Sequence, residues 1–284
     1  MTSRLPGAPR HCEECQRRGN PQLYIHHTLL IFILFLTISC TTTKSLTQND
    51  LLPPDSIRWS TLKPGFEITN QKIRELGVSW TCVKIDLSLI QAEPVIAVSE
   101  KPFSVKSFAR QRDLTVAVNT TQFSIEGSTV KAQGLIKAGA TILSEPVQSY
   151  CALCFTADGE GKLTCVISDN QTSTGIDKYD YVIGGFFVIL QDGQIPDFVQ
   201  TRRSRTACGT DDTGQLLYLF AVTPDFSLKD KNGLSYPECA AILKQLGCTN
   251  AMQFDGGHST SMVINGKNVQ TPLFQRKVAA AMGF

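Results

Sequence analysis

Histidine is scarce in this sequence of 284 residues, and its distribution is uneven. Three of the four histidines, His11, His26 and His27, lie within the first forty residues, and the fourth is His258. A Ser-His-Asp triad needs a histidine beside its nucleophile, and a multi-histidine metal site needs several. If the first forty residues are removed on export, only His258 remains. We therefore expect neither a triad with a distant histidine nor a multi-histidine metal site.

An excess of charge of either sign is also absent. The first forty residues hold four arginines and two glutamates of the chain's 27 basic and 25 acidic residues, which leaves 23 of each in the remainder. Nucleic-acid-binding domains usually carry a basic excess. The balance gives no support to a nucleic-acid partner, and we predict none.

A long apolar run occurs once, near the N-terminus. Arg17 and Arg18 precede the run 23–39, and Cys40 follows it directly. A basic segment followed by an apolar stretch is typical of a secretory signal, and a small residue before the cysteine resembles a bacterial lipobox. We predict that residues 1–40 are a signal peptide and that Cys40 is lipidated. The mature lipoprotein would be anchored by lipid on the exported side of the membrane, periplasmic or at the cell surface. The alternative is an uncleaved signal anchor.

The remainder lacks internal repeats and long low-complexity linkers. A polar, threonine-rich stretch and three prolines indicate a tether and lead-in over residues 41–65. Residues 66–284 are then enough for a single domain.

Short apolar runs separated by turn residues predict strands through most of this domain. The run 78–87 alternates apolar and polar residues, which suits a half-buried strand. The run 181–190 is strongly apolar but is interrupted by Gly184 and Gly185, which indicates a bulge or a close backbone approach. Further strands are predicted over 114–119, 134–142, 152–157, 163–168, 205–209, 215–222 and 251–254.

Helical patterns are few. One is short, over 104–111, and the stronger one covers 236–246. Ser235 and Glu238 have the spacing of a capping box, and Gly247 is a typical C-terminal stop. We therefore expect an α+β fold: a strand-rich single domain with a mixed or antiparallel sheet and few helices.

Seven of the ten cysteines follow the export segment, and an odd number leaves at least one unpaired. Residues 151–154 have CxxC spacing, but no second pair or histidine ligand accompanies them, so zinc is not expected. Most of the seven lie in apolar contexts typical of small core residues. Their disulfide pairing depends on the redox compartment and stays open.

The segment 255–261 has the composition of a functional loop. Asp255 follows a short apolar strand, and Gly256 and Gly257 allow the backbone to approach a ligand closely. Three hydroxyl residues follow at 259–261 and can bind phosphate or sugar oxygens. A carboxylate at the end of a buried strand is partly desolvated, which suits an acid, a base or a metal ligand. The alternative is a tight turn in which Asp255 caps backbone N–H groups.

A second feature is a cluster of arginines at positions 202, 203 and 205. Guanidinium groups bind anions bidentately, so the cluster is a candidate for gripping a phosphate. Arg205 is the best candidate for an inward role, because small and apolar residues follow it. The alternative is a solvated loop.

Together these segments resemble the phosphodiester glycosidase family. The sequence RTACG at 205–209 precedes a predicted strand, a helix ending in Leu-Gly at 246–247, and AMQFDGGHSTSM at 251–262. The residues that match are Arg205, Thr206, Ala207, Gly209, Leu246, Gly247, Asp255, Gly256, Gly257 and Ser259, with weaker matches at Asn119, Gly184, Gly185, Asn265, Gly266 and Arg276. The chain departs from the usual family pattern at three places. His258 stands where glycine is common, Asn119 is not followed by a small residue and two phenylalanines, and the segment 222–225 replaces an Asp-Gly turn.

The resemblance implies hydrolysis of the anomeric C–O bond of a sugar 1-phosphodiester or related surface glycan. The leaving group is then a phosphate monoester, which departs more readily than a sugar alkoxide. The site needs cations around the phosphate and a carboxylate that activates water or stabilises the oxocarbenium-like centre. Asp255 fits the carboxylate role, and Arg205, with Arg203, fits the phosphate role. His258 would bind phosphate, relay a proton or lie at the rim.

The same resemblance implies a carbohydrate or glycophosphate partner held by further residues. We predict substrate binding by Asn119, Gly185, Arg203, Thr206, Gly256, Gly257, Ser259, Thr260 and Arg276. A second carboxylate stays open among Asp86, Asp211, Asp212 and Asp225. No cofactor or metal is predicted, although a divalent cation held by carboxylates is an open alternative. The alternative function is that of a catalytically inactive, glycan-binding envelope lipoprotein.

Overall fold

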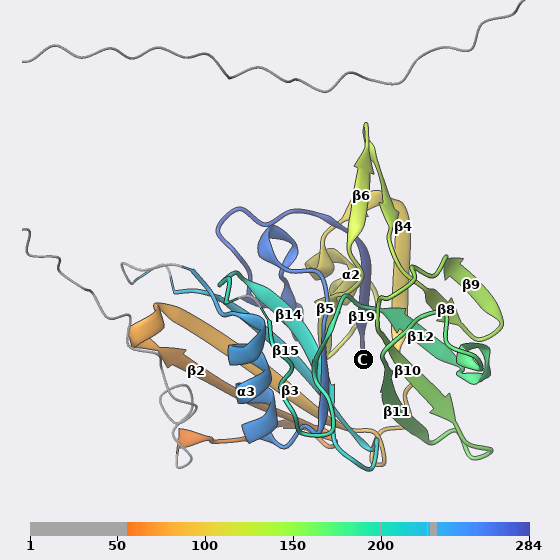
Figure 1. Ribbon diagram of the computed structural model, residues 1–284, viewed down its shortest axis with the longest axis horizontal. Coiled ribbons are helices and arrows are strands. Elements are labelled where there is room, and N and C mark those ends of the chain that lie inside the picture. The colour runs from red at the N-terminus through yellow and green to blue at the C-terminus, as the bar shows by residue number, and fades with distance from the viewer. Residues whose placement is uncertain (1–55, 199, 226, 228–231) are drawn as a thin grey trace, which may run out of the picture. The chain divides into compact units, whose positions relative to one another are not determined.

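The computed structural model describes residues 56–198, 200–225, 227 and 232–284 (Figure 1). These residues belong to one compact unit of the chain. The predicted signal peptide, the lipidated Cys40 and the tether up to residue 55 lie outside the described residues. Among the helices within those ranges, none combines the length and the apolar content that a membrane crossing requires.

Strands dominate the described unit, and every paired ladder is antiparallel. The seven-stranded sheet has the order β1 (Ser60–Lys63), β2 (Phe66–Ile73), β3 (Val78–Asp86), β15 (Leu216–Pro224), β14 (Arg205–Thr210), β16 (Asn250–Gln253) and β13 (Val188–Leu190). The chain thus enters this sheet at β1, ahead of the expected start of the domain at residue 66.

Two five-stranded sheets and a hairpin complete the strands. One sheet has the order β11 (Leu163–Ser168), β10 (Ala152–Ala157), β12 (Tyr181–Gly184), β8 (Ile136–Ala138) and β9 (Thr141–Ser144). The other has the order β18 (Lys267–Gln270), β17 (Met262–Ile264), β5 (Val116–Asn119), β19 (Val278–Gly283) and β4 (Val95–Phe103). The hairpin pairs β6 (Phe123–Glu126) with β7 (Thr129–Ala132).

The two α-helices of the described residues match the predicted ones, α2 (Val105–Gln111) and α3 (Tyr236–Leu246). The capping box of α3 is confirmed, because Ser235 accepts from the Glu238 N–H and the Glu238 carboxylate accepts from the Ser235 N–H. Short 3₁₀ turns occur at η2 (Arg74–Leu76), η3 (Ile176–Lys178) and η4 (Gly257–Ser259). The predicted α+β, strand-rich class with few helices is therefore confirmed.

The central strands of the seven-stranded sheet are covered on both faces. Along β15, Tyr218 and Phe220 face α3 in one hydrophobic cluster, and Leu217 and Leu219 face the other two sheets in another. Alternate residues of a strand point to opposite faces, so a doubly covered strand must be apolar throughout. Figure 1 shows α3 lying along one face of this sheet. The run at 216–222 is apolar throughout because both faces of β15 are covered.

The apolar run 181–190 does not form one strand. It breaks at the glycine pair into β12 and β13, which belong to different sheets. A Cβ atom on Gly185 would lie 2.2 Å from the Met252 methyl carbon and 2.8 Å from the Gln253 carbonyl oxygen. The expected close backbone approach is therefore confirmed, and it is an approach to β16.

All seven cysteines within the described unit are buried free thiols. Burial raises the pKa of the Cys154 thiol to about 12, and the pKa values of Cys151 and Cys208 are also raised by desolvation. The expected role as small core residues is thus confirmed for these positions, and their thiols are poor nucleophiles at neutral pH.

Candidate active site

The loop at 255–261 crosses from the seven-stranded sheet to a five-stranded sheet. It leaves β16, which pairs with β14, and enters β17, which pairs with β5. The loop therefore lies where the C-terminal end of β5 meets the start of β14. Asn119, Arg205 and Asp255, which are far apart in the sequence, are brought to this junction by strand pairing.

Asn119 holds the junction together. Its Nδ2 donates to the Asp255 carbonyl oxygen at 2.7 Å, and its Oδ1 accepts from the Thr206 hydroxyl at 2.7 Å and the Ser261 N–H at 2.9 Å. The side chain is only 1% exposed. Both polar atoms of the amide are thus engaged, with β14 and with both ends of the loop at 255–261.

Removal of this amide is expected to destabilise the fold. Asn119→Ala leaves three buried polar groups without their partner, so we expect a loss of about 3 kcal/mol in the free energy of unfolding. Urea denaturation followed by circular dichroism measures this loss. Asn70→Ala, at an exposed position of β2, should change stability by less than about 0.5 kcal/mol. Equal stabilities of the two variants would contradict the role of Asn119.

The two glycines of the loop serve different purposes. A Cβ atom on Gly256 would lie 2.8 Å from the Ser204 carbonyl oxygen, so the backbone passes too close to β14 for a side chain. Gly257 has φ of +59°, in the left-handed region that glycine tolerates best, and its N–H donates to the Ser204 oxygen at 2.7 Å. Both glycines dock the loop on the residue before Arg205.

Asp255 is the chemically distinctive group of the loop. Its Oδ1 accepts from the Gly256 N–H at 2.9 Å, and its carboxylate also hydrogen-bonds Ser259. Burial raises the pKa of Asp255, while the Ser259 hydroxyl, Arg276 and the Gly256 N–H oppose that shift. The net result is a carboxylate that accepts a proton more readily than an exposed aspartate, as a general base requires.

Arg276 provides the cation beside this carboxylate. Its Nη2 donates to the Ser259 hydroxyl at 3.0 Å, and its backbone N–H donates to the His258 carbonyl oxygen at 2.8 Å. Its guanidinium carbon lies 5.0 Å from the centre of the Phe123 ring. Arg276 and Asp255 thus share Ser259, while the Arg276 side chain stays exposed to solvent.

The arginine cluster at 202–205 divides into three separate environments. Arg202 forms an ion pair with Glu238, the glutamate of the capping box of α3. Arg205 is buried; it donates to the carbonyl oxygens of Leu234 and Thr201 and lies 4.0 Å from the Tyr236 ring centre. Arg203 is exposed, and its backbone pairs with Leu234. The three guanidinium groups therefore do not form one anion clamp.

The remaining predicted residues lie around the same junction. The Thr206 hydroxyl binds Asn119, and Gly185 packs against β16. His258 lies on η4 with its side chain exposed. The Thr260 hydroxyl is buried without a hydrogen-bond partner among the described residues, as are the hydroxyls of Thr120 and Ser261. Buried hydroxyls without a partner are uncommon and costly, and these three lie within or next to the segments that meet at the junction.

A row of aromatic rings, which sequence reasoning missed, borders the junction. Consecutive ring centres lie 4.2 to 6.0 Å apart along the series Tyr150, Phe186, Phe187 and Tyr236. Each ring is partly exposed. The Phe186 N–H donates to the Gln253 carbonyl oxygen, two residues before the catalytic candidate. In the sequence, the two adjacent phenylalanines that follow the glycine pair 184–185 could have indicated this row.

Three of the four alternative second carboxylates lie far from Asp255. Asp86, Asp211 and Asp212 are at the opposite end of the seven-stranded sheet, beside the turn between β14 and β15. Asp225 forms an ion pair with Lys72 at 2.8 Å, and the hydrogen bonds from Lys72 and Ser227 lower its pKa. In the part of the chain that the structure describes, no three acidic, cysteine or histidine side chains gather as a metal site.

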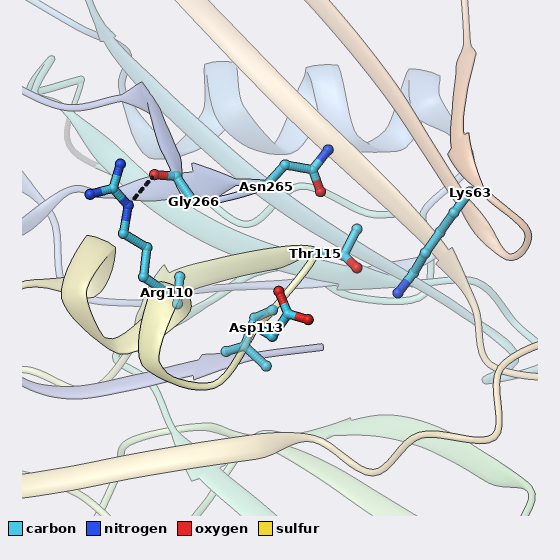
Figure 2. Close-up of a pocket in the computed structure, with 8 residues that line it drawn as sticks. Lys63, Arg110, Asp113, Thr115, Asn265 and Gly266 are labelled. Carbon is cyan, nitrogen blue, oxygen red and sulfur yellow. Dashed lines mark hydrogen bonds between the residues drawn. The ribbon is translucent and has the colours of Figure 1, made fainter.

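A cavity of about 410 Å³ lies at the other end of β5 and β17 (Figure 2). Thr115 and Asn265, which line it, are at the strand ends opposite Asn119 and Ser261. Lys63 and Asp113 point into the same space, and Arg110 donates to the Gly266 carbonyl oxygen at 3.1 Å. This cavity is therefore separate from the site at Asp255.

The fold and loop together define a strand-rich domain with a carboxylate, hydroxyls and a cation at a sheet junction. The family model for phosphodiester glycosidases matches residues 112–284, more than half of the chain. The chain belongs to the phosphodiester glycosidase family.

Individual proteins are similar to this chain in sequence or in fold. The chain is 34% identical over 82 residues to N-acetylglucosamine-1-phosphodiester alpha-N-acetylglucosaminidase of Mus musculus, which is 29% of this chain and 15% of the mouse protein. The zebrafish catalytic domain of that name, auto-inhibited by its pro-peptide, is similar with a TM-score of 0.61 and 19% identity, over 79% of this chain and 85% of that one. A Synechocystis protein has a TM-score of 0.63 and 15% identity, over 80% of this chain and 63% of that one. The matched segments thus span less than two thirds of the mouse and Synechocystis chains.

Proposed function

We propose that this protein hydrolyses the anomeric C–O bond of a sugar 1-phosphodiester. The observation that carries the proposal is the convergence of Asp255, Ser259 and Arg276. A carboxylate with a raised pKa lies beside a hydroxyl that it shares with a cation. Membership of the phosphodiester glycosidase family supports the reaction class.

In the proposed reaction, Asp255 accepts a proton from a water molecule as the water oxygen bonds to the anomeric carbon. The bond from that carbon to the phosphate oxygen breaks, and its electron pair remains on the phosphate. Arg276 stabilises the charge that develops there. Because a phosphate monoester is a good leaving group, the mechanism does not require a second carboxylate as a strong acid.

The sugar is proposed to lie over the aromatic row, because sugar rings have apolar faces and ligand sites are commonly lined by aromatic rings. Asn119 and Arg205 act here as positioning residues, since their polar groups bind other protein segments. His258 is proposed to lie at the rim of the site, beside the phosphate.

The direct test is to incubate the full-length protein with a panel of sugar 1-phosphodiesters and to measure the free sugar released. We expect turnover of at least one member. If no member is hydrolysed while the same sugar phosphates bind, the protein is a glycan-binding member of the family without turnover. Absence of both turnover and binding would contradict the proposal altogether.

A further inference from the structure

Apolar side chains border the Arg276 side of the site. We call Phe123, Ile125, Leu273 and Phe274 the apolar rim. Phe274 is 75% exposed, Leu273 67% and Ile125 58%. Single exposed apolar residues are common, but several of them on segments that meet at one polar site indicate an interaction surface.

The rim is connected to the catalytic candidates through one residue. Arg276 touches Ser259 with its Nη2 atom and lies over the Phe123 ring. Ile125 is two residues beyond Phe123 on β6, and alternate residues of a strand share a face. A pocket of about 160 Å³ is lined by both of these residues together with Arg276 and Lys277.

The other half of the rim precedes Arg276 on the same loop. Leu273 and Phe274 lie in a turn between β18 and β19, and Phe274 is separated from Arg276 by one residue. Two residues of extended chain span at most about 7 Å. Phe123 of the hairpin thus lies against the guanidinium, and Leu273 and Phe274 lie within three residues of Arg276 on its own loop.

An anion at Arg276 and an apolar group on the rim are complementary to the two parts of one amphipathic molecule. In a sugar 1-phosphodiester, the phosphate lies between the sugar and the aglycone. With the phosphate at Arg276 and the anomeric carbon at Asp255, the aglycone continues over the rim. A polar aglycone would leave Leu273 and Phe274 in water.

We propose that the apolar rim binds the alkyl or isoprenoid aglycone of a lipid-linked sugar 1-phosphodiester, whose phosphate is held by Arg276. This inference rests on the proposed function and names its substrate class. A bilayer surface and a soluble glycan are the competing occupants of the rim. In either case, kcat/KM for a dissolved substrate would not depend on the length of the alkyl aglycone.

The test compares two substrates that have the same sugar 1-phosphate but carry a methyl or a decyl group as the aglycone. The decyl substrate is used below its critical micelle concentration. For the full-length wild-type protein, we expect kcat/KM to favour the decyl substrate by at least about tenfold, the effect of burying about two methylene groups. In Leu273→Ser/Phe274→Ser, the decyl-to-methyl ratio should fall to about one. A wild-type ratio near one would overturn the proposal and favour a soluble glycan.

Leu89→Ser is the matched control, because Leu89 is 66% exposed and follows β3 at the opposite end of the seven-stranded sheet. It should keep the wild-type ratio. All variants are made with the same N-terminal sequence, so a contribution from it cancels in the comparison. A decyl preference that survives in the double variant would overturn the role of the rim.

If neither substrate is hydrolysed, the proposed function fails, and the rim is judged by binding alone. Calorimetry would then compare decyl methyl phosphate with dimethyl phosphate. Tighter binding of the decyl compound that is lost in the double variant supports the rim as an apolar subsite. Equal binding of the two phosphates overturns it.

Discussion

Asp255→Asn is expected to lower sugar release about 10³-fold without lowering the stability of the protein. The amide cannot accept the proton of the attacking water. Its oxygen can still accept the Gly256 N–H, so the local turn is preserved. The measurement is kcat/KM on the best substrate of the panel, with the unfolding free energy from urea titration of the same sample.

The stability of this variant separates a catalytic carboxylate from a structural cap. Burial raises the pKa of Asp255, so the folded protein binds that proton more tightly than the unfolded chain does. Stability then falls as pH rises from the ordinary aspartate pKa, about 3.9, through the raised folded value. The asparagine variant lacks this loss and should be at least as stable as wild type at pH 7. Marked destabilisation would instead support the turn-cap interpretation.

The same raised pKa predicts the acidic limb of the activity profile. Because the base must be ionised, kcat/KM of the wild type should rise with pH through a value above the usual aspartate range. The control is Asp192→Asn, an exposed position with φ of +48° at the opposite end of β16, where asparagine is well tolerated. It should retain wild-type activity within about twofold and the same pH profile.

Arg276→Ala is expected to lower kcat/KM about 100-fold, because it removes the cation beside the departing phosphate. Arg276→Lys should recover part of this loss, since it keeps the charge but loses the planar donor geometry. The fold should persist, because the side chain is exposed. Steady-state kinetics on one substrate measure all three proteins.

Arg74→Ala provides the charge-matched control. Arg74 is exposed on η2, before β3, and its removal changes the net charge by the same amount. A general electrostatic effect would lower the activity of both alanine variants alike. Loss confined to position 276 supports a direct contact with the anion, whereas wild-type activity of Arg276→Ala contradicts its proposed role.

Local sequence patterns determined several elements of this fold. The strands β10 and β11 and the helix α3 lie at the predicted residues. A short apolar run, an alternating pattern and a capping box respectively act within a few residues of chain. The composition of the loop at 255–261 likewise predicted a carboxylate beside glycines and hydroxyls. The family resemblance followed from the same local motifs.

Tertiary structure decided which of these residues meet. The arginines at 202–205 look equivalent in the sequence. In the structure, Arg202 pairs with the capping-box glutamate of α3, and Arg205 donates to a backbone carbonyl oxygen. Arg276 and Phe123 reach the site from other segments. Residue patterns fix which face of a strand is apolar, but not which strand lies beside it. The loop around Asp255 was therefore predictable from the sequence. The family resemblance also named Arg276, but only the packing of the sheets shows that Arg276, and not Arg205, lies beside Asp255 and next to the apolar rim.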